Sequence, residues 1–181
     1  HVPWGAWEKE RLKHSFGENP DSSVVRRIIE GNKLYWDAVD AFLESNTFTK
    51  VYQEASYVEH PNDEFLDGFG KYRRKDRNAD AFFRLLERGT KFVVTESREA
   101  YDEFRYRQVF EKPEMMAPRD LFMAYRIDKT LKDGENAVLF LGVEHKVDEI
   151  LRNSCNGISV ERFSHDPSYL IGLIESIQVK R

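Results

Sequence analysis

Residues 137–145 carry the strongest structural signal in the chain and read Ala137-Val138-Leu139-Phe140-Leu141-Gly142-Val143-Glu144-His145. The five consecutive apolar residues predict a strand buried on both faces, as in a parallel sheet that is covered by helices. Gly142 ends the run and permits a sharp exit turn, and His145 follows three residues later. Because open α/β sheets place their ligand sites at the carboxyl ends of their strands, we expect His145 to lie at the functional edge of the sheet.

Helical and strand patterns alternate along the rest of the chain. Apolar periodicity and capping residues predict helices over residues 22–43, 80–88, 97–110, 118–131 and 167–177, with a short helix after His145. Residues 49–54, 91–96 and 158–163 have strand patterns, whereas residues 57–69 lose the apolar period and predict a long loop that could contain a helical turn. This order predicts an α/β fold in a single domain over residues 1–181, with a layered, mostly parallel sheet and helices on both faces.

The composition is typical of a soluble globular protein. Of the 181 residues, 40% are hydrophobic and 33% are charged, which argues against extensive disorder. The net charge of -4 gives no global electrostatic reason to bind nucleic acid, and no apolar run approaches the roughly 18 residues of a membrane span. The single cysteine, Cys155, excludes an intrachain disulfide and is compatible with a reducing cytosol, where we expect the protein to act.

A second histidine, His1, opens the chain in the setting His1-Val2-Pro3-Trp4-Gly5. Because the first residue is not methionine, the chain is processed, trimmed or renumbered. If residues are missing before His1, an N-terminal strand that leads into it is missing with them. Two histidines at separate strand ends, His1 and His145, could share a metal ion or a substrate.

Three acid or imidazole side chains occupy corresponding strand ends. Glu54 ends the strand at 49–54, Glu96 ends the strand at 91–96, and His145 follows the strand at 137–141. Such a set can bind a divalent metal that lowers the pKa of bound water, or perform general acid–base catalysis without metal. The alternative is that each carboxylate caps the following helix or pairs with a nearby Arg or Lys.

Arg119 begins the helix that leads into the strand at 137–141. An arginine there could bind a carboxylate or phosphate through two N–H groups, or form a surface salt bridge with Asp120 or Glu114. The basic segment Lys71-Tyr72-Arg73-Arg74-Lys75-Asp76-Arg77 could touch phosphates, although the acidic total charge favours a solvated loop.

Two segments resemble the C-terminal half of the TraB/Tiki-like superfamily. They are Pro118-Arg119-Asp120-Leu121-Phe122-Met123-Ala124 and Val138-Leu139-Phe140-Leu141-Gly142-Val143-Glu144-His145. That group is marked by two GxxH motifs and acidic residues at strand ends, and it includes Tiki metalloproteases, ChaN-type proteins and erythromycin-esterase-like enzymes. By this resemblance His145 completes the second motif and His1 is the histidine of the first. Glu54, Glu96 and Arg119 match the family's acidic strand ends and the arginine before the second motif.

The leading hypothesis is a metal-dependent hydrolase that cleaves a peptide or another amide or ester bond. His1 and His145 would hold Zn, Mn or Co, because two histidines and a carboxylate suit these metals about equally. Glu54 or Glu96 would be a ligand or general base, and Arg119 would stabilise the substrate or the developing negative charge. The competing hypothesis is a protein that binds a small molecule or a peptide in the same cleft without turnover.

Overall fold

The structure is a computed structural model that describes residues 22–57, 62–99, 117–142, 145–155, 157–163 and 174–180. The strands of this part of the chain form one sheet in the order β2-β1-β3-β5-β4. These strands are β1 (Lys50–Tyr57), β2 (Lys91–Glu96), β3 (Asn136–Gly142), β4 (Ser159–Phe163) and β5 (Ile174–Lys180).

β1 lies between β2 and β3 and pairs in parallel with both. β5 is antiparallel to β3 and to β4, so β4 points the same way as the first three strands. The prediction of a mostly parallel sheet is confirmed.

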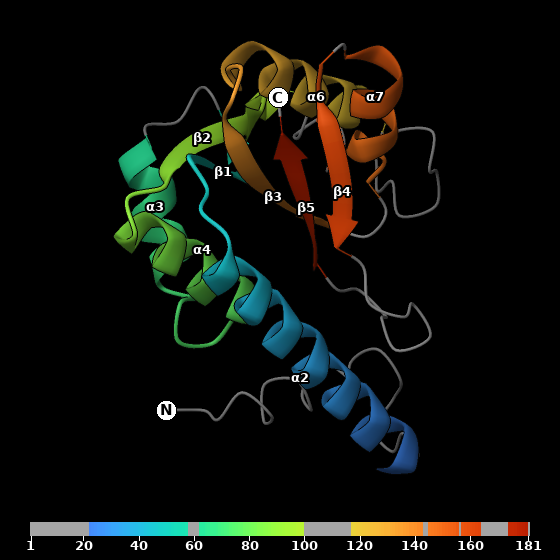
Figure 1. Ribbon diagram of the computed structural model, residues 1–181. Helices are drawn as coiled ribbons and strands as arrows, with labels where there is room; N and C mark the ends of the chain where they lie inside the picture. Colours follow the sequence, from blue (N-terminus) through green and yellow to red (C-terminus); the bar gives the residue numbers. More distant parts are fainter. Residues whose placement is uncertain are drawn as a thin grey trace.

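Helices cover both faces of the sheet, as the sequence predicts (Figure 1). One face packs against α2 (Ser22–Ser45), α3 (Asn62–Gly70) and α4 (Arg77–Glu87), and the opposite face packs against α6 (Ala117–Thr130) and α7 (Val147–Ser154). Because successive side chains of a strand alternate between faces, β3 contributes to both cores. Leu139 and Leu141 pack with α6 and α7, whereas Val138 and Phe140 pack on the side of α2 and α4.

Several helix and strand predictions agree with the structure, and local chemistry explains their ends. α4 begins after Asp76, whose side chain accepts hydrogen bonds from the backbone N–H groups of Asn78 and Ala79. The predicted stop of this helix at Gly89 is confirmed by its φ of 87°, a left-handed conformation that favours glycine. Gly134, with a φ of 78°, likewise follows the end of α6.

Two predicted segments differ from the structure. The expected loop at 57–69 contains the helix α3, because Phe65 and Phe69, which lie four residues apart on one helix face, pack against the core beside Phe82. The segment is too short for a clear helical period to stand out in the sequence. The expected helix at 167–177 is wrong over residues 174–177, which belong to β5, because pairing with β3 and β4 outweighs the local helical pattern. Most of the helix predicted at 97–110 lies outside the described residues.

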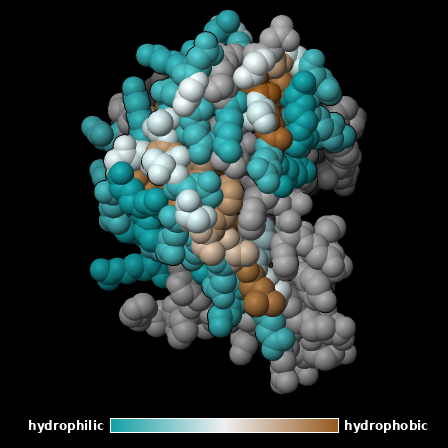
Figure 2. Space-filling model, viewed as in Figure 1, coloured by the Kyte–Doolittle hydropathy of each residue, from teal (hydrophilic) through white to brown (hydrophobic). Residues whose placement is uncertain are grey.

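The described surface is largely polar. Figure 2 shows hydrophilic residues over most of one face and a small hydrophobic patch over α2, the helix that carries the exposed Leu34. None of the helices in the described ranges is both long and apolar enough to cross a membrane.

Candidate functional site

The carboxyl ends of β1 and β3 define the place where a ligand site is expected. The chain leaves β1 for α3 on one face of the sheet and leaves β3 for α7 on the opposite face. In open α/β sheets, neighbouring parallel strands whose connections diverge in this way leave a crevice between their carboxyl ends. Glu54 of β1 and His145, three residues beyond Gly142 of β3, meet at this point, with 2.9 Å between Oε1 and Nε2.

Five ionisable side chains form what we call the edge cluster: Glu54, Glu96, Arg119, Asp120 and His145. Arg119 and Asp120 come from the first turn of α6, which packs against β2. Glu54 comes from the second half of β1, Glu96 is the last residue of β2, and His145 lies three residues beyond β3. Glu54 is 22% exposed, whereas the remaining side chains are at most 3% exposed. Glu54 is therefore the member of the cluster that solvent reaches most easily.

Glu54 has a hydrogen-bonding partner on each oxygen. Oε2 accepts the backbone N–H of Gly142 at 2.7 Å, and Oε1 lies 2.9 Å from both Arg119 Nη2 and His145 Nε2. Burial alone would raise the pKa of this carboxyl group. The hydrogen bond and charge of His145, the charge of Arg119 and the Gly142 amide outweigh burial and lower the pKa to about 2. Glu54 is therefore an anion at neutral pH.

His145 is held between two carboxylates. Nδ1 contacts Asp120 Oδ1, and Nε2 contacts Glu54. The other oxygen of Asp120 accepts the backbone N–H of Lys146 at 2.8 Å, which fixes the carboxylate beside the ring. Burial opposes the charged imidazole, but the contacts with Asp120 and Glu54 outweigh it and raise the pKa of His145 to about 9. The ring is an imidazolium at neutral pH.

Arg119 bridges the two glutamates. Its Nε donates to Glu96 Oε2 at 2.7 Å, and its Nη2 donates to Glu96 Oε1 and to Glu54 Oε1, both at 2.9 Å. Burial alone would lower the pKa of this guanidinium group, and the contacts with Glu96 and then Glu54 raise it above its ordinary value. The planar fork of arginine suits this geometry, whereas the point charge of a lysine does not.

A second group of charges holds the backbone of His145. Arg162 of β4 donates from Nη2 to the carbonyl oxygen of His145 at 2.8 Å and to Asp148 Oδ1 at 3.0 Å. Asp148 also binds Arg152, one turn later in α7, at 2.7 Å. His145 is therefore anchored to β4 as well as to α6, and Arg162 also binds α7.

The structure brings together most of the residues that the sequence singled out. Glu54, Glu96, Arg119 and His145 meet at one edge, and His1 lies outside the described residues. The two glutamates pair with an arginine, as the simpler alternative anticipated, although that arginine is remote in sequence. The alternative of a surface salt bridge for Arg119 does not hold, because its side chain is only 3% exposed and binds Glu96 through two N–H groups.

Asp120 is the member that sequence reasoning missed. Because Asp120 directly follows Arg119, the sequence suggests only that its carboxylate pairs with the arginine. Its position in the first turn of a helix is a weak signal, since carboxylates are common there for electrostatic reasons. Its role as the partner of His145 depends on α6 meeting the turn after β3, which the local sequence does not reveal.

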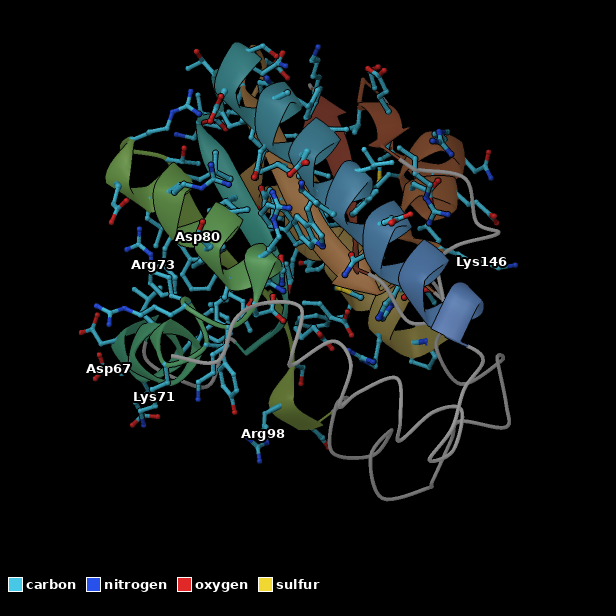
Figure 3. The ribbon with its side chains drawn as sticks, turned by 90° about the horizontal axis from the view of Figure 1, so that it is seen from below. Asp67, Lys71, Arg73, Asp80, Arg98 and Lys146 are labelled. Carbon is cyan, nitrogen blue, oxygen red and sulfur yellow. The ribbon has the colours of Figure 1, made fainter. Side chains whose placement is uncertain are left out.

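The basic segment 71–77 forms ion pairs on the opposite side of the sheet from α6. Arg73 binds Glu87 at 2.6 Å and lies 3.5 Å from Asp80, beside which Figure 3 places it. Arg77 binds Asp37 and Asp40 of α2 at 2.9 and 2.7 Å. These carboxylates compete for the positive charges that a phosphate would need.

No protein-family model, no curated protein and no solved structure matches this chain. The resemblance to the TraB/Tiki-like superfamily therefore stays a prediction from the sequence.

Replacing Asp120 with asparagine is expected to lower the pKa of His145 from about 9. Asparagine keeps the shape of the side chain but removes the charge that faces Nδ1. NMR titration of the His145 ring measures this change. A matched Asp148→Asn variant, which leaves both ring nitrogens with their partners, should change the pKa less. Equal values in Asp120→Asn and the unmodified protein would show that Asp120 does not hold the charged ring.

Proposed function

We propose that this chain is a hydrolase that cleaves a peptide or another amide or ester bond at the edge cluster. The observation that carries the proposal is the Glu54–His145 contact of 2.9 Å, at the carboxyl ends of the parallel strands β1 and β3, where open α/β sheets bind their ligands. The anionic carboxylate of Glu54 and the cationic imidazole of His145 are buried side by side, and strongly shifted pKa values cluster at functional sites.

The two side chains can divide the proton transfers of hydrolysis between them. The oxygen of a water molecule attacks the carbonyl carbon while Glu54 takes a proton from that water. The proton on His145 Nε2 passes to the leaving nitrogen or oxygen as the scissile bond breaks. The proton on Glu54 then returns to Nε2 across the short contact, which restores the starting state. Asp120 holds the ring in place, and Arg119 holds Glu54.

The divalent metal that the family resemblance implies requires a third ligand. Glu54 and His145 are two donors, and Asp120 binds Nδ1 in the way that carboxylates orient metal-bound histidines. Among the described residues, no group of three His, Cys, Asp or Glu side chains could hold a metal ion. The expected further ligand, His1, lies outside them. The described donors thus do not complete a metal centre, and the steps above use side chains alone.

Non-catalytic binding of a small molecule or a peptide is the second candidate function. The charge state of the site favours it, because a carboxyl group with a pKa of about 2 is a weak base. Moreover, both ring nitrogens of His145 already have carboxylate partners. A ligand that raises the melting temperature without being turned over would support this candidate.

Glu54→Gln is expected to lower kcat on a responsive substrate by roughly 100-fold or more, because it removes the group that accepts the proton of water. The measurement uses a panel of p-nitrophenyl esters and amino-acid p-nitroanilides, with and without added Zn, Mn or Co. Glu87→Gln is the matched control, since Glu87, the last residue of α4, is an exposed carboxylate that pairs with Arg73. Equal loss in both variants would contradict the proposal.

Metal content separates the two forms of the hydrolase hypothesis. Metal analysis of the purified protein and of His145→Ala should show metal only in the unmodified protein if His145 is a ligand. Equal and negligible metal in both proteins, together with hydrolysis of a substrate by the unmodified protein, would contradict the metal-dependent form and support the acid–base pathway through Glu54 and His145.

A further inference from the structure

The end of β1 departs from regular sheet pairing just where Glu54 lies. Gln53 is paired with Val94 of β2, and the next paired positions are Tyr57 and Glu96. β1 therefore places three residues, 54–56, opposite the single residue Thr95. Such bulges bend a strand, re-aim its side chains and are common beside active sites. Here the bulge contains Glu54 itself.

Two buried hydroxyl groups take over the hydrogen bonds that the bulge interrupts. The carbonyl oxygen of Gln53 accepts from Ser56 Oγ at 2.5 Å and from Thr95 Oγ1 at 2.6 Å. The backbone N–H of Thr95 donates to Ser56 Oγ at 3.1 Å. Both Ser56 and Thr95 are 0% exposed. Without the hydroxyl groups, a buried carbonyl oxygen would lose its partners, which is unfavourable.

The hydroxyl contacts involve the residues that flank both glutamates of the edge cluster. Gln53 directly precedes Glu54, Ser56 follows it by two positions, and Thr95 directly precedes Glu96. The two hydroxyl groups bind main-chain groups, namely the carbonyl oxygen of Gln53 and the N–H of Thr95. Their effect on the site therefore passes through the backbone.

We propose that Ser56 and Thr95 are positioning residues, whose hydroxyl groups lock the bulge and thereby hold the Glu54 carboxylate against Gly142, Arg119 and His145. In the hydrolase proposed above, on which the kinetic part of this inference rests, Glu54 must lie within hydrogen-bonding reach of the water it activates. A displacement of about 1 Å in such a group can cost roughly 100-fold in rate.

The test replaces Thr95 with valine, which has the same shape but no hydroxyl group, and with serine, which keeps the hydroxyl group. The amide proton of Gly142 reports directly on the position of Glu54, since it donates to Glu54 Oε2 at 2.7 Å. We expect Thr95→Val to shift the NMR resonance of this proton and to speed its hydrogen exchange by about 10-fold or more. Thr95→Ser should retain both properties. Ser56→Ala should act as Thr95→Val does, and it supplies the measurement if the valine variant does not fold.

Kinetics give an independent readout. Both hydroxyl-free variants should lower kcat more than they raise KM, and Thr95→Ser should restore most of the loss. An unchanged Gly142 amide in Thr95→Val and in Ser56→Ala would overturn the inference, whatever the activity. If the Gly142 amide is perturbed in these variants but the unmodified protein hydrolyses none of the substrates, the positioning role of Ser56 and Thr95 stands and the proposed function is overturned.

Discussion

Replacing Arg119 with methionine is expected to lower the free energy of unfolding by roughly 3–5 kcal/mol, the usual cost of removing one partner from a buried ion pair. The guanidinium group is 3% exposed and is shared by Glu96, which is 1% exposed, and Glu54. Without Arg119, a buried carboxylate loses both its counter-charge and two hydrogen bonds. Urea denaturation followed by circular dichroism measures the change.

Two further variants identify the cause of that loss. Arg119→Lys keeps the positive charge but cannot reproduce the bridge between two carboxylates, so an intermediate stability is expected. The double variant Arg119→Met/Glu96→Gln removes the charge that Arg119→Met leaves unpaired, and it should be more stable than the single variant. If Arg119→Met lowers the free energy of unfolding by less than about 1 kcal/mol, the Arg119–Glu96 pair contributes no more than a surface salt bridge does, which would contradict the prediction.

Stability is expected to be greatest between the ordinary pKa values of Glu54 and His145, 4.5 and 6.5, and to fall on both sides. The pKa of Glu54 is depressed to about 2, so its contribution is complete above 4.5 and is lost as the pH falls toward 2. The pKa of His145 is raised to about 9, so its contribution is complete below 6.5 and is lost as the pH rises through 9. Each pKa shift corresponds to about 3 kcal/mol in the free energy of unfolding. The two contributions overlap and do not add, because part of each shift comes from the contact between Glu54 and His145.

Urea denaturation at about pH 5.5 and about pH 10 measures the alkaline side of this profile. His145→Gln removes the titrating ring and should reduce the loss of stability between these two pH values. Replacing the exposed Lys71, which lies outside the edge cluster, with glutamine should leave that loss unchanged. An identical alkaline loss in His145→Gln would show that another group causes it.

Local patterns in the sequence were sufficient for the elements that build the edge. The apolar run that ends at Gly142 is β3, and the segment that ends at Glu96 is β2 with the predicted bounds. These predictions succeed because burial on both faces demands continuous apolar residues, which is a local property. The same rule fails for residues 174–177, where the strand depends on partners far away in the chain.

The position of the glutamates and of His145 at one edge follows from parallel strands, whose carboxyl ends meet. The sequence by itself therefore determined the α/β layers and nominated Glu54, Glu96, Arg119 and His145. Only the tertiary structure decided that α6 turns Asp120 toward His145 and that a bulge closed by Ser56 and Thr95 sets Glu54 in place. The physical reason is that these hydrogen bonds join residues up to 42 positions apart in the sequence, and their geometry depends on packing that no local pattern encodes.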